Sequence, residues 1–104
     1  MIPAVRRFCW DEIPLDKVTE MVSRKEICAD GQGLAQTYLK KGALVPLHAH
    51  EASQWLYVLQ GALAVTIGRD VQVLREGEVL RISARTEHQA EAMEDTFVLD
   101  LRGR

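Results

Sequence analysis

Glycine-containing turns divide most of this chain into short runs of β-forming residues. This spacing of the turns limits the folds that the chain can adopt. The turns include those at Gly42, Gly61 and Gly77. Within residues 63–67, large apolar residues alternate with smaller or polar ones, as in a strand with one buried face. Strand runs that recur about every ten residues, with turns between them, predict an antiparallel all-β sandwich or barrel. The predicted strands are residues 34–39, 54–59, 63–67, 71–74, 79–82, 88–92 and 96–101.

Residues 15–24 carry apolar side chains at helical spacing, but the surrounding sequence argues against a helix. Polar residues and a proline precede this segment, and a strand-like run overlaps its end, so we interpret it as a turn or an irregular arm. A chain of 104 residues supports one hydrophobic core. We therefore expect a single domain over 1–104, with an N-terminal arm and edge strands in 1–30 and a barrel in 34–101.

The composition excludes several kinds of partner. Thirteen lysine and arginine residues against fifteen aspartate and glutamate residues give a net charge of −2, which offers no general attraction for nucleic acid or an anionic membrane. No apolar run approaches the ~20 residues of a membrane span. The first residues do not form a secretory signal, so we expect a cytoplasmic protein. Cys9 and Cys28 lie outside any CxxC pattern and are expected to be reduced, buried thiols.

The three histidines of the chain, His48, His50 and His88, have a spacing that suggests a metal site. Residues two apart on a strand point to the same side, so His48 and His50 can present their rings together. Gln54 follows on the same parity, and His88 opens a later strand that a closed barrel would bring alongside. Three imidazoles and an amide oxygen could then hold one divalent transition metal. The alternative is that these residues are ordinary hydrogen-bonded or surface side chains.

The same positions resemble the first motif of the cupin superfamily. Its marked residues align with Gly42, His48, His50, Gln54 and Gly61, with glutamine standing where the family usually has glutamate.

The second cupin motif is matched less completely. Gly77 and His88 are in register, whereas Ser83, Arg85 and Ala92 stand at its proline, glycine and asparagine positions. The resemblance implies a cupin-type double-stranded β-helix, which is a jelly-roll barrel, and the cupin metal ligands.

Within this superfamily the chain is most similar to the KdgF-like cupins, which are linked to pectin and alginate breakdown. The similarity rests on residues 22–25, 41–46, 57–59 and 94–100, together with Gln54. It implies that His48, His50, Gln54 and His88 bind the metal and that Asp100, on a late strand, takes part in the reaction.

The neutral ligand set bears on the chemistry. Imidazoles and an amide leave a divalent ion its full charge, and no ligand carboxylate is present to support a higher oxidation state. This favours non-redox isomerisation or lyase chemistry over dioxygen chemistry. The resemblance to the KdgF-like cupins implies, more specifically, isomerisation or ring opening of a small sugar-acid-like substrate. A metal-dependent dioxygenase and a non-catalytic ligand-binding cupin stay open as alternatives. The ligands do not distinguish Ni, Zn, Mn, Fe and Cu.

Three further expectations concern orientation. Asp100 faces the barrel interior only if Thr96 and Val98 do, and apolar residues on both parities leave this open. Arg85 is the candidate for binding a substrate carboxylate, since arginine matches one bidentately. Trp55 and Tyr57 alternate with Gln54 and therefore face outward, where either a homodimer partner or the N-terminal arm would cover them.

Overall fold

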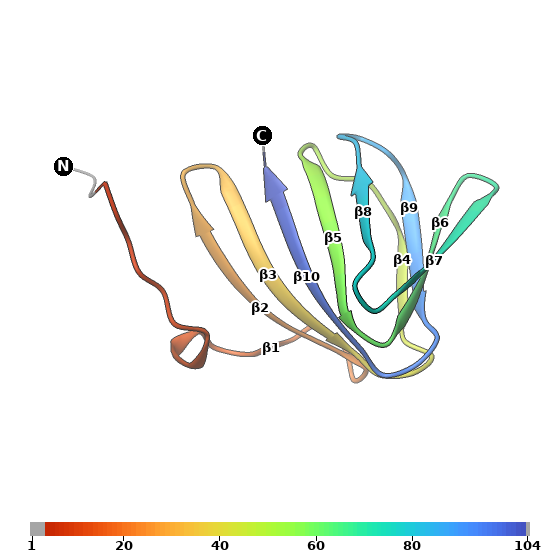
Figure 1. Ribbon diagram of the computed structural model, residues 1–104, viewed down its shortest axis with the longest axis horizontal. Helices are drawn as coiled ribbons and strands as arrows, with labels where there is room; N and C mark the ends of the chain where they lie inside the picture. The colour runs from red at the N-terminus through yellow and green to blue at the C-terminus, as the bar shows by residue number, and fades with distance from the viewer. Residues whose placement is uncertain (1–3, 104) are drawn as a thin grey trace.

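Two antiparallel sheets lie face to face in the computed structural model, which describes residues 4–103 (Figure 1). One sheet has six strands in the order β1-β2-β3-β10-β5-β8, and the other has four in the order β4-β9-β6-β7. This arrangement confirms the predicted all-β, antiparallel jelly-roll architecture. The strands are β1 (Asp16–Lys17), β2 (Val22–Ala29), β3 (Gln32–Leu39), β4 (Leu44–His48), β5 (Ser53–Gln60), β6 (Ala62–Ile67), β7 (Asp70–Arg75), β8 (Val79–Ile82), β9 (His88–Ala92) and β10 (Thr96–Gly103).

Two tight hairpins show how the glycine turns set the strand register. In the β2–β3 hairpin Ala29 pairs with Gln32, and both intervening residues, Asp30 and Gly31, have positive φ angles of 52° and 78°. An Asp-Gly pair with two positive φ angles is the preferred type I′ hairpin turn, because its twist matches that of the flanking strands. In the β6–β7 hairpin Gly68 takes the positive φ, at 61°.

The hydrophobic core lies between the two sheets. Along β5 the side chains alternate, with Leu56 and Val58 buried and Trp55 and Tyr57 exposed. Val65 on β6 is fully buried in the same cluster, and burying a side chain of this size contributes about 1.5–3 kcal/mol. The outward orientation of the two β5 aromatics agrees with the sequence parity.

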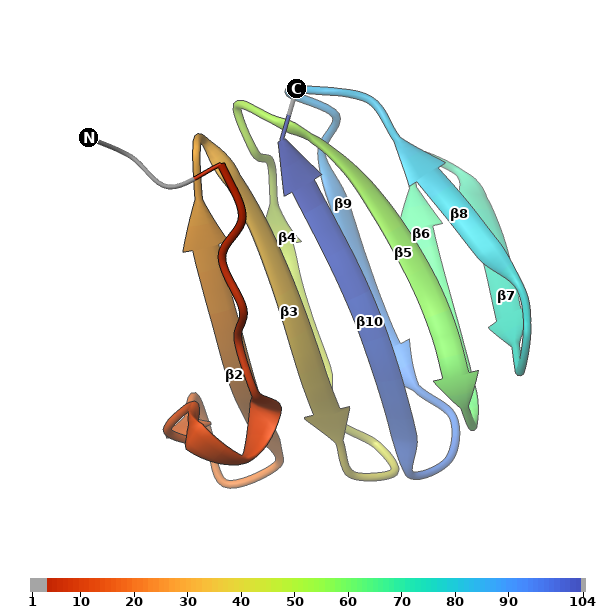
Figure 2. The same cartoon turned by 60° about the vertical axis from the view of Figure 1, so that its left-hand side comes forward.

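The N-terminal segment widens the six-stranded sheet. Strand β1 pairs with β2, and β2 pairs with β3. Figure 2 shows β2 at one side of the larger sheet, with the four-stranded sheet behind the larger one. A short 3₁₀ turn, Trp10–Glu12, is held beside β2 by a hydrogen bond of 2.9 Å from Lys25 Nζ to the Trp10 carbonyl. Residues 15–24 contain no helix, as expected, but they are not irregular throughout, because they include β1 and the start of β2.

The cysteines differ from the prediction. Both are free, as expected, but both are exposed rather than buried. Cys28 lies near the end of β2, on the flank of the larger sheet, and Cys9 lies in the arm just before the 3₁₀ turn, so the core covers neither.

Among residues 4–103, the structure contains no helix with the length and apolar character that crossing a membrane requires.

Candidate metal centre

His48 and His50 lie close together, although they do not share a strand. Strand β4 ends at His48, and His50 follows it in an irregular segment, so the assumption of one continuous strand was wrong for His50. The Nε2 atoms of the two rings are nevertheless 3.0 Å apart. The segment is anchored by the Arg85 backbone N–H, which donates a hydrogen bond of 2.6 Å to the His50 carbonyl.

Strand β9 brings the third histidine to the same place. His88 is the first residue of β9 and is the register partner of His48 on β4. The ring centroid of His88 lies 4.3 Å from that of His48 and 5.3 Å from that of His50. One ring nitrogen from each histidine lies within 4.8 Å of the other two, so the three residues could hold a metal ion.

Backbone carbonyls fix the orientation of two of these rings. Nδ1 of His48 lies 2.7 Å from the Pro46 carbonyl, and Nδ1 of His88 lies 2.8 Å from the Thr86 carbonyl. Since a carbonyl can only accept, each Nδ1 carries the proton and each neutral ring keeps its lone pair on Nε2. Outer hydrogen bonds of this kind orient the histidine ligands of metal sites.

The surroundings of His50 and His88 favour the neutral form of both rings. Burial, followed by the charge of Arg102, lowers the pKa of His50 from its ordinary value of 6.5 to about 4; the other two histidines and Arg24 act in the same direction. Burial also lowers the pKa of His88, although its hydrogen bond to the Thr86 carbonyl raises it. Neutral imidazoles are the form that binds a metal.

Gln54 supplies a fourth donor that fits this site. It is the second residue of β5, is 5% exposed, and lines the same cavity as the histidines. Its Oε1 atom is buried and makes no hydrogen bond to another residue of the described chain. The residues present therefore fit a divalent metal with neutral ligands.

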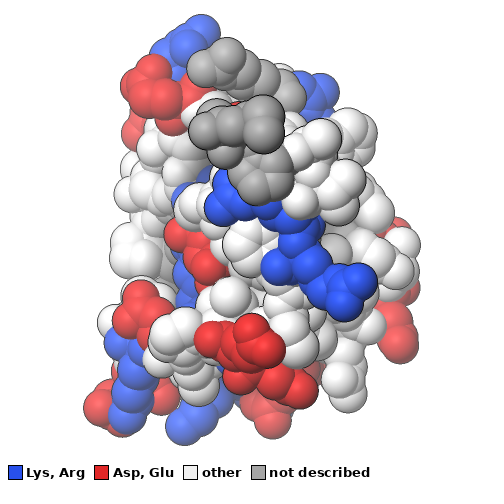
Figure 3. Space-filling view, turned by 90° about the vertical axis from the view of Figure 1, so that its left-hand side faces the viewer, with Lys and Arg blue, Asp and Glu red and all other residues white. Residues whose placement is uncertain are grey.

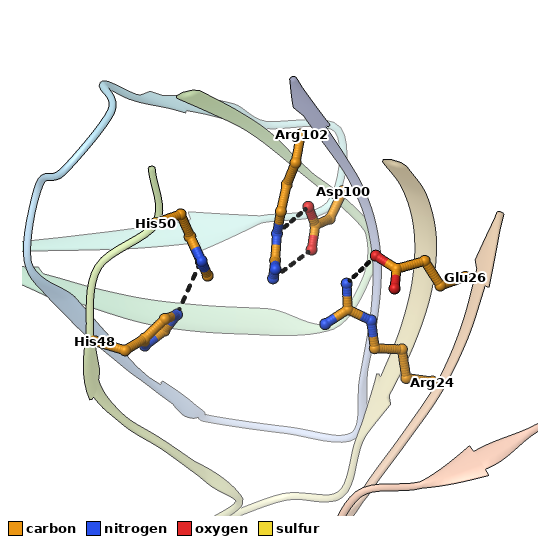
Figure 4. A network of polar contacts seen from close by, with 6 residues as sticks. All are labelled: Arg24, Glu26, His48, His50, Asp100 and Arg102. Carbon is orange, nitrogen blue, oxygen red and sulfur yellow. Dashed lines mark hydrogen bonds and ion pairs between the residues drawn. The ribbon is translucent and has the colours of Figure 1, made fainter. Parts of the chain in front are cut away.

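Strand β10 settles the orientation of Asp100. Thr96, Val98 and Asp100 are buried, whereas Leu101 is exposed, so the aspartate points inward and is itself 4% exposed. Its side chain forms an ion pair with Arg102, with Asp100 Oδ1 3.3 Å from the Nε atom and Oδ2 3.4 Å from Nη2 (Figure 4).

A second arginine reaches the cavity from β2. Arg24 Nη2 donates a hydrogen bond of 2.8 Å to Glu26 Oε2 two residues along the strand. The backbone of β3 leaves room for this pair, because a Cβ on Gly33 would lie 3.2 Å from Glu26 Oε2. The sequence analysis did not single out Arg24 or Arg102 as functional residues. The sequence feature that could have identified Arg102 is its position two residues after Asp100, because residues two apart on a strand point to the same face.

Arg85 lies elsewhere. It is exposed on the turn between β8 and β9 and does not line this cavity. Its contact with a substrate carboxylate stays a prediction.

The cavity between the sheets has a volume of about 430 Å³, within the range typical of small-molecule sites. Imidazoles lie on one side, and the Asp100–Arg102 pair lies on the β10 side (Figure 4). Apolar side chains form much of the remaining lining. They include Val22, Leu39, Leu44, Val45, Leu47, Leu56, Leu63, Val65 and Val98.

The fold and the site together define a double-sheet β-barrel that presents imidazole and amide ligands in its interior. Residues 36–101 match the cupin domain family. The chain therefore belongs to the cupin family. None of the curated proteins matches it.

Solved structures extend the comparison. KdgF from a Halomonas species is 29% identical, with 92% of each chain covered and a TM-score of 0.83. An RmlC-like cupin from Shewanella frigidimarina is 19% identical, covering 96% of this chain and 91% of its own, with a TM-score of 0.86. Oxalate decarboxylase from Bacillus subtilis, described with Mn(II) centres, is 19% identical, with a TM-score of 0.85; the match covers 98% of this chain and 30% of the decarboxylase.

Proposed function

We propose that this cupin is a metal-dependent enzyme that isomerises or opens the ring of a small sugar-acid-like substrate without net oxidation. The observation that carries the proposal is the inward orientation of Asp100, which lines the same cavity as the three histidines and Gln54. Similarity to KdgF at 29% identity over nearly the whole chain supports this choice of chemistry.

The residues have separate roles in this proposal. His48, His50, Gln54 and His88 hold one divalent transition metal, which supplies a +2 charge that polarises a substrate carbonyl or hydroxyl. The Pro46 and Thr86 carbonyls keep two of the imidazoles in the orientation described above.

Asp100 moves the proton. Its carboxylate is buried, and the side chain that it contacts among the described residues is Arg102, at 3.3 and 3.4 Å. A carboxylate has about four lone-pair sites, so acceptor sites remain for a bound molecule. The carboxylate takes a proton from one substrate atom and returns it to another, which rearranges the bonds and leaves the enzyme unchanged. Because no electron is gained or lost, dioxygen is not consumed, and oxygen uptake by the iron- or copper-loaded protein would indicate the rival dioxygenase.

The metal part of the proposal has a direct test. Elemental analysis of untagged protein, reconstituted with Ni, Zn, Mn, Fe or Cu, should give about one ion per chain for one or more of these metals. His88→Ala should lose the metal, whereas Gln89→Ala, on the exposed side of β9, should keep it. Less than one ion per chain with every metal would refute the site.

The catalytic part is tested with unsaturated uronates as substrate. Asp100→Asn should abolish turnover while leaving the metal content unchanged, and the control variant Asp70→Asn, at the exposed start of β7, should retain activity. Full activity of Asp100→Asn would remove this residue from the mechanism. Tight binding of the acid without conversion by the wild type would favour a non-catalytic ligand-binding cupin.

The proposal includes a homodimer formed through the outer face of the six-stranded sheet. Trp55 and Tyr57 are 49% and 37% exposed there, and Val79 and Leu101 on the paired strands are exposed beside them. The 3₁₀ turn of the arm contacts β2 instead. Basic and acidic side chains both occur, among uncharged ones, on the side of the molecule shown in Figure 3.

A further inference from the structure

Two arginine side chains share a cavity wall with Asp100, on the side away from His48. The end of the Arg102 side chain lies between His50 and Asp100, and that of Arg24 points toward the same region from β2 (Figure 4). Both arginines line the cavity that contains the metal-site residues. Their positive charges act on the His50 ring, whose pKa they help to lower.

The strand register explains this convergence. Arg102 lies opposite Gln54 on β5 and opposite Gly33 on β3. Arg24 pairs with Thr37 on β3, which in turn pairs with Val98 on β10. All of these positions lie on the inward face of the six-stranded sheet. The two guanidinium groups therefore reach the same cavity from different strands, Arg24 from β2 and Arg102 from β10.

Each guanidinium retains unused hydrogen-bond donors. Arg24 donates to Glu26, and Arg102 is ion-paired with Asp100, with Nε 3.3 Å from Oδ1 and Nη2 3.4 Å from Oδ2. The Nε atom of Arg24 is buried and makes no hydrogen bond to another residue within the described 4–103. A guanidinium has five N–H donors, so these ion pairs leave several of them for a ligand. A buried donor without an acceptor is unfavourable, and an acceptor group bound in the cavity would satisfy it.

We infer that Arg24 and Arg102 form a carboxylate-binding subsite that selects acids over neutral analogues of the same size. The planar fork of a guanidinium matches the two oxygens of a carboxylate. A carboxylate held there leaves the rest of a small molecule between Asp100 and the histidines, where the reaction proposed above takes place. The placement of the reacting carbons in this inference rests on the proposed function. The preference for a carboxylate concerns binding alone and can be measured without any reaction.

The test compares two sugars that differ only in this group. Isothermal titration calorimetry of the zinc-reconstituted protein should show that glucuronate binds at least tenfold more tightly than glucose. Arg24→Gln and Arg102→Gln should each weaken glucuronate binding about tenfold or more, because each change removes charge-assisted hydrogen bonds to the carboxylate. Neither change should alter glucose binding by more than about twofold. Arg75→Gln, an exposed arginine on β7 in the other sheet, is the matched control and should leave both affinities unchanged.

Removing Arg102 leaves the buried Asp100 without its ionic partner, so stability needs a separate control. Arg102→Lys keeps the charge but not the planar fork, and Asp100→Asn/Arg102→Gln removes both charges of the pair. Both should fold, bind zinc at one ion per chain, and show the reduced glucuronate affinity. Equal binding of the two sugars by the wild type, or unchanged glucuronate affinity in Arg24→Gln and Arg102→Lys, would overturn the inference. A wild type that prefers glucuronate but converts no uronate would retain this subsite and refute the proposed reaction.

Discussion

Arg85 stands where the second cupin motif has glycine, and its backbone conformation explains why the motif has glycine there. It has a φ of 61°, which glycine adopts readily and other residues adopt at a cost. The cupin motif has glycine at this position. The structural reason is that the Arg85 N–H must bond the His50 carbonyl from a left-handed turn.

Replacing this arginine by glycine should not harm the fold. Relief of the left-handed strain, about 1–2 kcal/mol, is offset in part by the extra chain entropy of glycine. We expect Arg85→Gly to leave the free energy of unfolding unchanged or to raise it by up to ~1 kcal/mol, measured by urea denaturation. Arg85→Ala keeps the strain and tests the predicted substrate contact through KM. A loss of stability in Arg85→Gly above that amount would contradict the explanation.

The lowered pKa of His50 should make the metal-free protein sensitive to mild acid. The unfolded chain takes up a proton near pH 6.5, whereas folded His50 does so only near pH 4. Because the unfolded state then binds more protons, the free energy of unfolding falls as the pH drops through this window. His88 acts in the same direction.

Urea denaturation of metal-free protein between pH 7 and pH 5 would measure this loss. His50→Asn should show a shallower dependence on pH than the wild type over the same range. Parallel curves for the two proteins would show that His50 does not titrate as described.

The site could be predicted only in part from its residues. The spacing of His48, His50 and His88 was sufficient to place three rings together. The orientation of Asp100 was not, because β10 is apolar on both parities and only its two neighbouring strands decide which face turns inward. Once that face is known, Arg102 follows from its spacing.

Gly61, in the turn between β5 and β6, lies where the backbone angle and the neighbouring atoms both disfavour a side chain. Its φ is +92°, and an added Cβ would lie 2.7 Å from Thr96 Oγ1 and closer still to the Asp95 carbonyl. Gly68 also has a positive φ, but an added Cβ there meets nothing within 4 Å.

These two glycines form a matched pair for mutation. Gly61→Ala combines backbone strain with overpacking and should lower the free energy of unfolding by roughly 2–4 kcal/mol. Gly68→Ala adds only the strain and should cost about 1 kcal/mol. Thermal or urea denaturation would measure both values. Equal losses would show that the contact with the β10 turn is not tight.

The predicted runs correspond to seven of the ten strands that the structure describes. Strands β1 and β4 are not among these runs, and the sequence marked β2 only as a strand-like run within the edge strands of 1–30. Predicted runs such as 63–67 and 79–82 agree with β6 and β8 to within a residue or two. Strand β2 contains Arg24, Lys25 and Glu26 in succession, so no apolar period marks it. Its pairing with β3 through the Asp-Gly turn is what forms the strand.

At the scale of the whole molecule, the outer face of the six-stranded sheet should determine the oligomeric state. We expect a dimer for the wild type and a monomer for Tyr57→Lys, because a buried lysine opposite a second copy is unfavourable. Val73→Lys, equally exposed on β7 of the other sheet, should remain dimeric. Light scattering coupled to size-exclusion chromatography would distinguish these outcomes. A wild-type monomer, or a dimeric Tyr57→Lys, would place the interface elsewhere.

The candidate metal ligands come from β4, the segment after it, β5 and β9, and Asp100 comes from β10. Strands this distant along the chain meet only when the two sheets are nearly complete, and such non-local pairing makes folding slow, on the scale of milliseconds to seconds. We therefore expect the candidate metal site to form late in folding. Added metal should leave the refolding rate unchanged and slow unfolding, because it would bind after the transition state for folding and stabilise only the folded protein. Stopped-flow refolding and unfolding with and without zinc would separate the two rates.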